Sequence, residues 1–283
     1  MTKLCIGLLS YCNSSTHPER FKIFKECLKS LELIVSDEIF IYALDNGSSQ
    51  DVVDLLEKSP HISEVYRASE NLFDNLAVHL LAKKANELKA EYVMHLEDDF
   101  LFYDNRNFLN SCIEILEINK DICGYIRILK YDYENKDMYD KLSNHPNKDM
   151  ANFQRHFNNI SKSNLTWSEK NPWGNFDFYL TNWHWYNFPN ICRTDVFKKI
   201  IPKSDCFPLQ YLEGEMMKNY HNLNLMTGVM DLGVVSHMAN YTPEASVRIS
   251  NKAPGKTPEN QFPIVEIEKV NREVERLLCN QKK

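Results

Sequence analysis

The sequence is short of glycine, of basic charge and of long apolar runs, and each shortage excludes a class of protein. Glycine accounts for only 8 of the 283 residues and aromatic residues for 12%, a balance that disfavours long disorder and favours a packed core. The formal net charge of −6 offers no basic surface for DNA or RNA, so no nucleic-acid partner is expected.

Signals for membranes and disulfides are lacking too. No apolar run approaches the roughly 18 residues that suggest a transmembrane helix. The apolar stretch at residues 4–9 is shorter still and lacks the small-residue cleavage site of a signal peptide. The 8 cysteines include no Cys-x-x-Cys pair, which favours reduced thiols in the core. We expect a cytoplasmic protein without a transmembrane segment, with attachment to a membrane surface left open.

What is present is an alternation of strands and helices. Short apolar runs predict strands, and segments with apolar residues three or four apart predict helices. The alternation implies crossover units and an α/β fold, with a Rossmann-like, mostly parallel central sheet flanked by helices. In the first half, strands are predicted at residues 3–10, 38–44, 63–67, 91–96 and 122–129, and helices at 18–31, 51–58, 75–89 and 107–118.

The second half is richer in loops. Residues 131–168 are polar and show no clear period, which predicts a loop-rich insertion. An aromatic block follows at residues 183–188. Further strands are predicted at 190–193, 223–227 and 233–237, and further helices at 195–200, 209–220 and 266–279.

Three polar clusters fall at predicted strand ends, at residues 10–11, 45–46 and 97–99. The carboxyl ends of parallel strands meet at one edge of a sheet, and ligands bind there. We therefore expect the three clusters to lie together.

The acid run Glu97-Asp98-Asp99 is the strongest single signal. Adjacent carboxylates repel one another unless a cation or solvent compensates them, and at a strand end they would form an oxygen site for Mg²⁺ or Mn²⁺ on phosphates. The alternative is a helix N-cap, where acidic residues are common. His237 ends another apolar run and would join the metal site only if its strand lay beside the acid run; the alternative is a structural histidine.

The order and spacing of four motifs over residues 3–102 resemble the GT-A fold glycosyltransferases, especially the inverting family 2-like group. Downstream, Gly214-Glu215 and His237 look like later, looser motifs of that family. The four motifs are Leu-Leu-Ser-Tyr-Cys-Asn at 8–13, Asp-Asn-Gly-Ser-Ser-Gln-Asp at 45–51, Glu-Asn-Leu-Phe-Asp-Asn at 70–75 and His-Leu-Glu-Asp-Asp at 95–99.

The resemblance implies a GT-A type fold and a metal-dependent glycosyltransferase. Residues 1–130 would form the nucleotide-sugar-binding half, 131–245 a loop-rich acceptor-binding and catalytic half, and 246–283 a mobile loop and C-terminal helix. The cofactor would be Mn²⁺ or Mg²⁺. The donor would be a UDP-, GDP- or dTDP-linked sugar, and the acceptor a glycan, a lipid-linked sugar or a small molecule.

The same resemblance assigns residues to the donor and the metal. Asp99 and His237 would ligate the metal. Asp45 would accept a hydrogen bond from the base. The residues expected to bind the donor are Ser10, Tyr11, Asp45, Asn46, Asn75, Glu97, Asp98, Arg248 and Lys252.

An inverting transfer needs a carboxylate base to take the proton of the acceptor hydroxyl. Glu215 and Glu213 are the candidates, with Asp177 and Asp195 as fallbacks. Met216 stands where the family usually has aspartate, so the catalytic base could be Glu215, Glu213 or neither. Positions two apart on a helix face different ways, so Glu213 and Glu215 cannot both serve, and a surface location for both is the alternative.

Trp183, His184 and Trp185 are expected to contact the acceptor, because apolar sugar faces pack well on aromatic rings; core packing is the alternative. Two other functions stay open. A catalytically inactive nucleotide- or carbohydrate-binding protein of the same fold would lack a usable base. A sugar nucleotidyltransferase usually has glycine and a cation in its first loop, and residues 10–15 contain neither.

Overall fold

The structure is a computed structural model. The loop-rich insertion predicted at 131–168 lies outside its described residues, as do 246–263, which include Arg248 and Lys252, and the residues Trp183, His184 and Trp185. The described residues are 2–103, 108–128, 171–173, 176–181, 189–203, 206–208, 212–230, 234–237 and 264–280.

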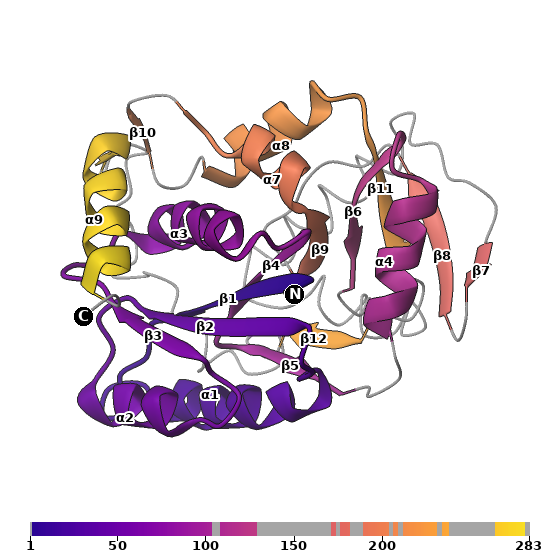
Figure 1. The fold of residues 1–283 in the computed structure, drawn as a ribbon. Coiled ribbons are helices and arrows are strands. Elements are labelled where there is room, and N and C mark those ends of the chain that lie inside the picture. Colours follow the sequence, from indigo (N-terminus) through magenta and orange to yellow (C-terminus); the bar gives the residue numbers. More distant parts are fainter. Residues whose placement is uncertain are drawn as a thin grey trace, which may run out of the picture.

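A nine-stranded sheet forms the centre of the molecule (Figure 1). Its strands lie in the order β3 (Glu64–Arg67), β2 (Ile39–Asp45), β1 (Leu4–Ser10), β4 (Tyr92–Glu97), β9 (Asn190–Arg193), β6 (Cys123–Arg127), β11 (Met226–Met230), β8 (Phe176–Thr181) and β7 (Asn171–Trp173). Only β9 and β8 run against the direction of the other strands of this sheet. The sheet is therefore mostly parallel, and the predicted α/β class is confirmed.

Helices cover both faces of the sheet. On one face lie α1 (Pro18–Ser30), α2 (Gln50–Lys58) and α4 (Phe108–Ile118), and on the other α3 (Phe73–Leu88), α7 (Thr194–Ile200) and α8 (Leu212–His221). A short 3-10 turn, η1 (Leu31–Leu33), follows α1, and α9 (Ile267–Asn280) packs against α3 (Figure 1). Because both faces are covered, every residue of β1 is buried, which explains why its sequence is one continuous apolar run.

The ends of several elements follow local backbone chemistry. Pro18 occupies the start of α1, where its missing N–H is not needed. Strand β11 begins at Met226, later than the predicted residue 223, because Asn224 takes a left-handed conformation (φ 53°) in the turn after α8. Strands β7 and β8 were not predicted from the sequence.

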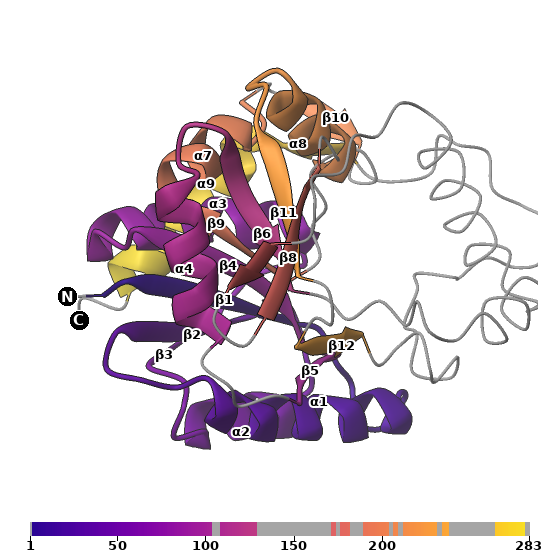
Figure 2. The same ribbon diagram turned by 90° about the vertical axis from the view of Figure 1, so that its right-hand side faces the viewer.

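A strand, and not a helix, follows the acid run. β5 (Phe100–Phe102) begins directly after Asp99 and pairs antiparallel with β12 (Val235–His237), and Figure 2 shows both between the sheet and α1. The helix-cap interpretation of the acid run is therefore wrong, since the next helix, α4, comes only after β5.

A further two-stranded ladder joins β10 (Cys206–Pro208) to β13 (Ile264–Glu266). Within the described part of the chain, none of the helices combines the length and the apolar character that crossing a membrane requires.

Candidate functional site

The C-terminal ends of three parallel strands lie side by side. Ser10 of β1 is opposite Asp45 of β2, and Leu9 of β1 is opposite Glu97 of β4. The polar clusters predicted at these strand ends are therefore brought to one edge of the sheet, where ligands of α/β proteins bind.

Hydrogen bonds tie the loops after β1 and β2 together. The amide N of Cys12 donates to Ser48 Oγ (3.1 Å), and the amide N of Ser49 donates to the carbonyl O of Cys12 (3.0 Å). Gly47 takes a left-handed conformation (φ 105°) that favours glycine. The Tyr11 ring lies 3.9 Å from where a Cβ of Gly47 would be and Tyr11 is 45% exposed, so these loops present an aromatic ring to solvent.

Asp45 and Asn46 are buried and bonded. Asp45 Oδ1 accepts from the amide N of Ser48 (2.8 Å), and Asp45 Oδ2 lies 3.5 Å from Nε of the half-exposed Arg67. The Asn46 amide nitrogen donates to Asn71 Oδ1 (2.7 Å). These contacts fix both side chains, and Asp45 would exchange Arg67 for a ligand donor to play its predicted role.

On the α1 side of this edge, one arginine neutralises two carboxylates of the acid run. Arg20 Nη1 donates to Asp99 Oδ2 (2.9 Å), and Arg20 Nη2 donates to Asp98 Oδ1. Asp98 Oδ2 accepts from the amide N of Tyr11 (3.0 Å) and from Ser10 Oγ (3.3 Å). Burial raises the pKa of Asp98, and Arg20 opposes that rise.

On the α3 side, Asp74, His95 and Glu97 form a second polar group. One possible ligand atom from each lies within 4.8 Å of the others, and His95 Nε2 is 3.9 Å from Glu97 Oε1. His95 and Glu97 share a face of β4 because they are two residues apart on a strand. Asp74 joins them from the first turn of α3.

Burial dominates the electrostatics of this second group. It raises the pKa of Asp74 to about 6, with a further contribution from Asp99. Although 32% of the Glu97 side chain is exposed, burial also raises the pKa of its carboxyl well above the usual range, Asp74 and Asp99 add to the rise, and Arg20 opposes it. Burial lowers the pKa of His95 to about 4, so this imidazole is neutral near pH 7 and keeps a free lone pair.

His95 and Asn75 are buried polar residues without hydrogen bonds. They are 2% and 0% exposed, and within the described part of the structure neither the two ring nitrogens of His95 nor the two amide atoms of Asn75 have a partner. Buried polar atoms in native proteins are nearly always bonded. These atoms are therefore available to a bound ligand or ion.

Strand β12 brings His237 beside the acid run. The backbone of His237 is paired with that of Phe100, the residue that follows Asp99. This meets the condition that the sequence set for a metal-binding histidine, while its role as a ligand stays a prediction.

The candidate bases Glu213 and Glu215 lie on α8 and are both partly buried. Met216 is fully buried and faces the core, so it is a packing residue. The Glu215 side chain is 37% exposed and one of its carboxylate oxygens, Oε2, lies 3.8 Å from Lys218 Nζ on the same helix. The assignment of either glutamate as the base stays a prediction.

The fallback base Asp195 lies at the wrong edge of the sheet. Arg193 of β9 is opposite Tyr92, the first residue of β4, and Asp195 is bonded to Arg193 (3.0 Å). The acid run is at the other end of β4, so Asp195 is excluded. The side chain of Asp177 lies outside what the structure describes.

Three residues of the edge were missed by sequence reasoning: Arg20, Asp74 and His95. A usable signal existed for His95, because the pattern His95-x-Glu97 on a predicted strand places both side chains on one face. No local pattern in the sequence predicts that Arg20, in the first turn of α1, contacts the acid run. Nor does one predict that Asp74, at the start of α3, lies near the end of β4.

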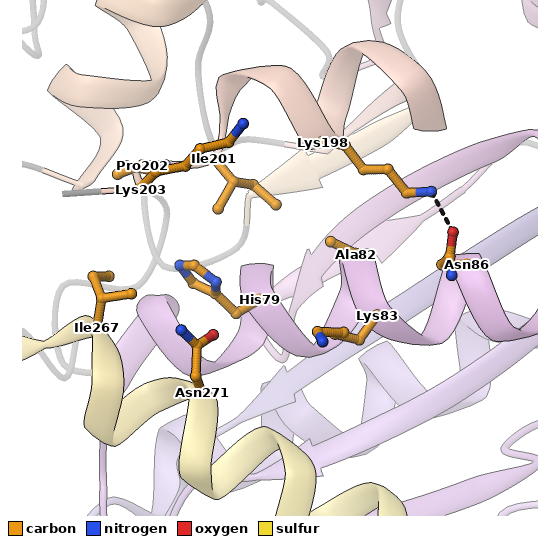
Figure 3. A pocket seen from close by; sticks show the side chains of 10 residues that line it. All are labelled: His79, Ala82, Lys83, Asn86, Lys198, Ile201, Pro202, Lys203, Ile267 and Asn271. Atoms are coloured by element: carbon orange, nitrogen blue, oxygen red, sulfur yellow. Dashed lines mark hydrogen bonds between the residues drawn. The ribbon is translucent and has the colours of Figure 1, made fainter. Parts of the chain in front are cut away.

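Two pockets formed by described residues lie away from this edge. One of about 490 Å³ lies between α3, α7 and α9, where His79, Lys83 and Lys198 line it and Lys198 Nζ donates to Asn86 Oδ1 at 2.6 Å (Figure 3). The other, of about 500 Å³, surrounds η1 and the start of β1. Neither contains a residue predicted to bind donor or metal.

No family model matches the sequence, and no curated protein matches it. Solved structures do match. One is a mannosyltransferase from Pyrobaculum calidifontis in complex with GDP-Man and Mn²⁺, with 16% identity over 47% of this chain and 37% of that chain and a TM-score of 0.36. Another is S. aureus TarS 1–349 in complex with UDP, with 13% identity over 98% of this chain and 71% of that chain and a TM-score of 0.47.

A third match is a cytidylyltransferase from Leptospira borgpetersenii, with 12% identity over 78% of this chain and 72% of that chain and a TM-score of 0.42. The chain spans 37% of the mannosyltransferase and 43% of a longer TarS structure. Glycosyltransferases are thus among the solved structures to which the chain is similar, as the motifs led us to expect. Structural similarities at this level of identity concern the fold and not a shared function.

Proposed function

We propose that the chain is a glycosyltransferase that moves a sugar from a nucleoside-diphosphate sugar to an acceptor hydroxyl. The observation that carries this proposal is the alignment of the ends of β1, β2 and β4. It gathers an exposed aromatic ring, two tied polar loops and a row of carboxylates at one edge, which are the groups that a base, a ribose and a metal-bound diphosphate require.

Each part of the donor has a matching residue. The exposed ring of Tyr11 would stack on the base, while Asp45, with Asn46 beside it, would accept from a ring N–H. Glu97 and Asp98 would orient the ribose, with Ser10 holding Asp98 in place through its hydrogen bond.

The residues at the end of the acid run fit a divalent cation. The backbone of His237 is paired with that of Phe100, the residue after Asp99. The carboxylate of Asp99 and the imidazole of His237 would form an oxygen and nitrogen donor set that suits Mn²⁺, and Mg²⁺ is the other candidate. When bound there, such an ion stabilises the charge of the departing diphosphate. Arg20 donates a hydrogen bond to Asp99, so the Asp99 carboxylate would have to exchange this bond for the ion or bind both.

The acceptor side completes the proposal. Glu215 or Glu213 would take the proton from the acceptor hydroxyl as its oxygen attacks the anomeric carbon and the nucleoside diphosphate leaves, which is the base that an inverting single displacement requires. Trp183, His184 and Trp185 would hold the acceptor, and Arg248 and Lys252 would close on the phosphates. The donor would be UDP-, GDP- or dTDP-linked, and the acceptor a glycan, a lipid-linked sugar or a small molecule.

The test is a melting-temperature screen of UDP-, GDP- and dTDP-sugars with Mn²⁺, since a ligand that binds only the folded state raises the melting temperature. We expect one nucleotide to stabilise the protein and Asp45→Asn to weaken its binding by about tenfold or more, because a hydrogen bond to a charged acceptor is lost. Asp54→Asn on α2 is the matched control. Absence of any nucleotide-dependent shift contradicts the proposal.

Product analysis then separates the three functions. Release of a nucleoside diphosphate from the sugar donor indicates a glycosyltransferase. Formation of a nucleotide-sugar from a nucleoside triphosphate and a sugar phosphate indicates a nucleotidyltransferase. Binding without either product indicates an inactive binding protein.

A further inference from the structure

The group on the α3 side of β4 has the composition of a cation site. Asp74, His95 and Glu97 each offer one ligand atom, all within 4.8 Å of one another. An ion with bonds of about 2.1 Å holds neighbouring donors roughly 3 Å apart. Small side-chain rotations are therefore enough to close this group around an ion.

His95 provides a second, independent sign of a ligand. It is 2% exposed, neither of its ring nitrogens has a hydrogen bond within the described part of the structure, and Nε2 points towards Glu97 Oε1 at 3.9 Å. A structural histidine in a core normally donates one ring N–H and accepts at the other nitrogen. This side chain does neither and is aimed at two carboxyl groups.

The charges around the group favour a cation. The carboxyl groups of Asp74 and Glu97 both approach the buried His95 ring, with one ligand atom of each of the three residues within 4.8 Å of the others, and carboxylates this close repel one another unless a positive charge lies between them. Arg20 does not supply it directly, because its guanidinium bonds to Asp98 and Asp99 on the other side.

We propose that Asp74, His95 and Glu97 bind a divalent transition-metal ion, such as Mn²⁺ or Zn²⁺, without any nucleotide. One imidazole nitrogen with two carboxylate oxygens is a donor set that both ions accept. The site is separate from the Asp99–His237 position at which a metal would meet the donor. It shares Glu97 with the ribose-binding role proposed above, but it is tested without nucleotide, so it can fail while the nucleotide-sugar proposal stands, and the reverse.

The first experiment measures Mn²⁺ and Zn²⁺ binding to the nucleotide-free protein by equilibrium dialysis and by the shift in melting temperature. Replacement of a ligand by its uncharged amide, as in Asp74→Asn or Glu97→Gln, is expected to weaken binding by at least about tenfold. Glu57→Gln, at an exposed position on α2, is the matched control and should leave the affinity unchanged. No binding of either metal at millimolar concentration, or an affinity that Asp74→Asn and Glu97→Gln leave unchanged, overturns the proposal.

The second experiment identifies the nitrogen ligand. Pulsed electron paramagnetic resonance of bound Mn²⁺ detects coupling to a directly bonded imidazole nitrogen. That coupling is expected to disappear in His95→Asn and to persist in His237→Asn. The opposite pattern overturns the proposal, as does a spectrum of the wild-type protein without nitrogen coupling. If His95→Asn does not fold, Glu97→Gln still tests the site through its affinity.

Discussion

The carboxyl groups on the two sides of the end of β4 differ in whether a cationic side chain contacts them. On the α1 side, Asp98 and Asp99 share the guanidinium of Arg20, and Asp98 has two further donors. On the α3 side, His95 has no hydrogen bond within the described residues, and Arg20 opposes the raised pKa of Glu97 only at a distance, while the neighbouring acids add to it. The first side has a cation in direct contact, whereas the second would gain most from a proton or an external cation.

The difference shows that a run of acids is not one site. Strand β4 ends at Glu97, whose side chain shares a face with His95. The chain then turns, and Asp98 and Asp99 both bond to Arg20 of α1. The carboxylates that look most like metal ligands in the sequence are the ones that already have a cation. Four substitutions test this difference between the two sides.

The largest effect is expected from Arg20→Met. This change leaves Asp98 and Asp99 buried without their counter-charge, and breaking a buried ion pair costs about 3–5 kcal/mol. The free energy of unfolding from urea titration measures the loss. Lys22→Met on the same helix removes an exposed ion pair with Glu19 and should cost less than about 1 kcal/mol. Equal losses in the two variants would mean that the α1 side is not held by Arg20.

The next effect is acid sensitivity at His79 of α3, which lines the pocket between α3, α7 and α9 and lies away from the end of β4. Burial, with Lys83 adding to it, lowers the pKa of His79 to about 4. Because the unfolded chain binds this proton near pH 6.5 and the folded protein does not, His79 contributes stability that is lost as the pH falls from about 6.5 towards 4, up to roughly 2 kcal/mol by pH 5. Unfolding measured from pH 7 to pH 5 should show a weaker pH dependence in His79→Gln than in the wild-type protein.

Arg20→Met provides a second pH-dependent comparison. Arg20 itself does not titrate in this range, but it lowers the pKa of Asp98. Without Arg20, Asp98 takes up a proton more readily, so the cost of Arg20→Met should be smaller at pH 5 than at pH 7. A pH dependence that is unchanged in His79→Gln would contradict the assignment of the acid sensitivity to His79.

A smaller effect is expected from Ser10→Ala. The Ser10 hydroxyl is buried and donates to Asp98 Oδ2 at 3.3 Å, so its loss should cost about 1 kcal/mol. Asp98 retains Arg20 and the amide N of Tyr11, which limits the damage. Ser15→Ala, at an exposed position bonded to Asn13, is the control and should change the free energy of unfolding by less.

The smallest effect is expected from His95→Leu in metal-free buffer. A buried polar side chain without a partner contributes little, and an apolar residue of similar size should be neutral to within about 1 kcal/mol or slightly stabilising. The same urea titration measures it. A loss of more than about 2 kcal/mol in the free energy of unfolding would show that the His95 side chain makes a stabilising hydrogen bond in the folded protein.

Much of the fold was predictable because it depends on local patterns. The strands predicted at residues 3–10 and 38–44 and the helix opened by Pro18 are confirmed by β1, β2 and α1. Periodic apolar residues and turn residues such as Gly47 act within a few positions of the chain, so they can be read directly. Strands β7 and β8 were not predicted because they are short and follow a long polar stretch of sequence without a clear period.

The sequence alone was enough to predict strands β1, β2 and β4, the polar clusters at their carboxyl ends, and the meeting of these clusters at one edge of a parallel sheet. How the charges are shared at that edge depends on the tertiary structure. Arg20 and Asp74 come from helices on opposite faces of the sheet, far along the chain from the acid run, and their approach depends on packing against β4 and β5. Side-chain periodicity extends along one element, whereas compensation of a buried charge depends on whichever element packs over it.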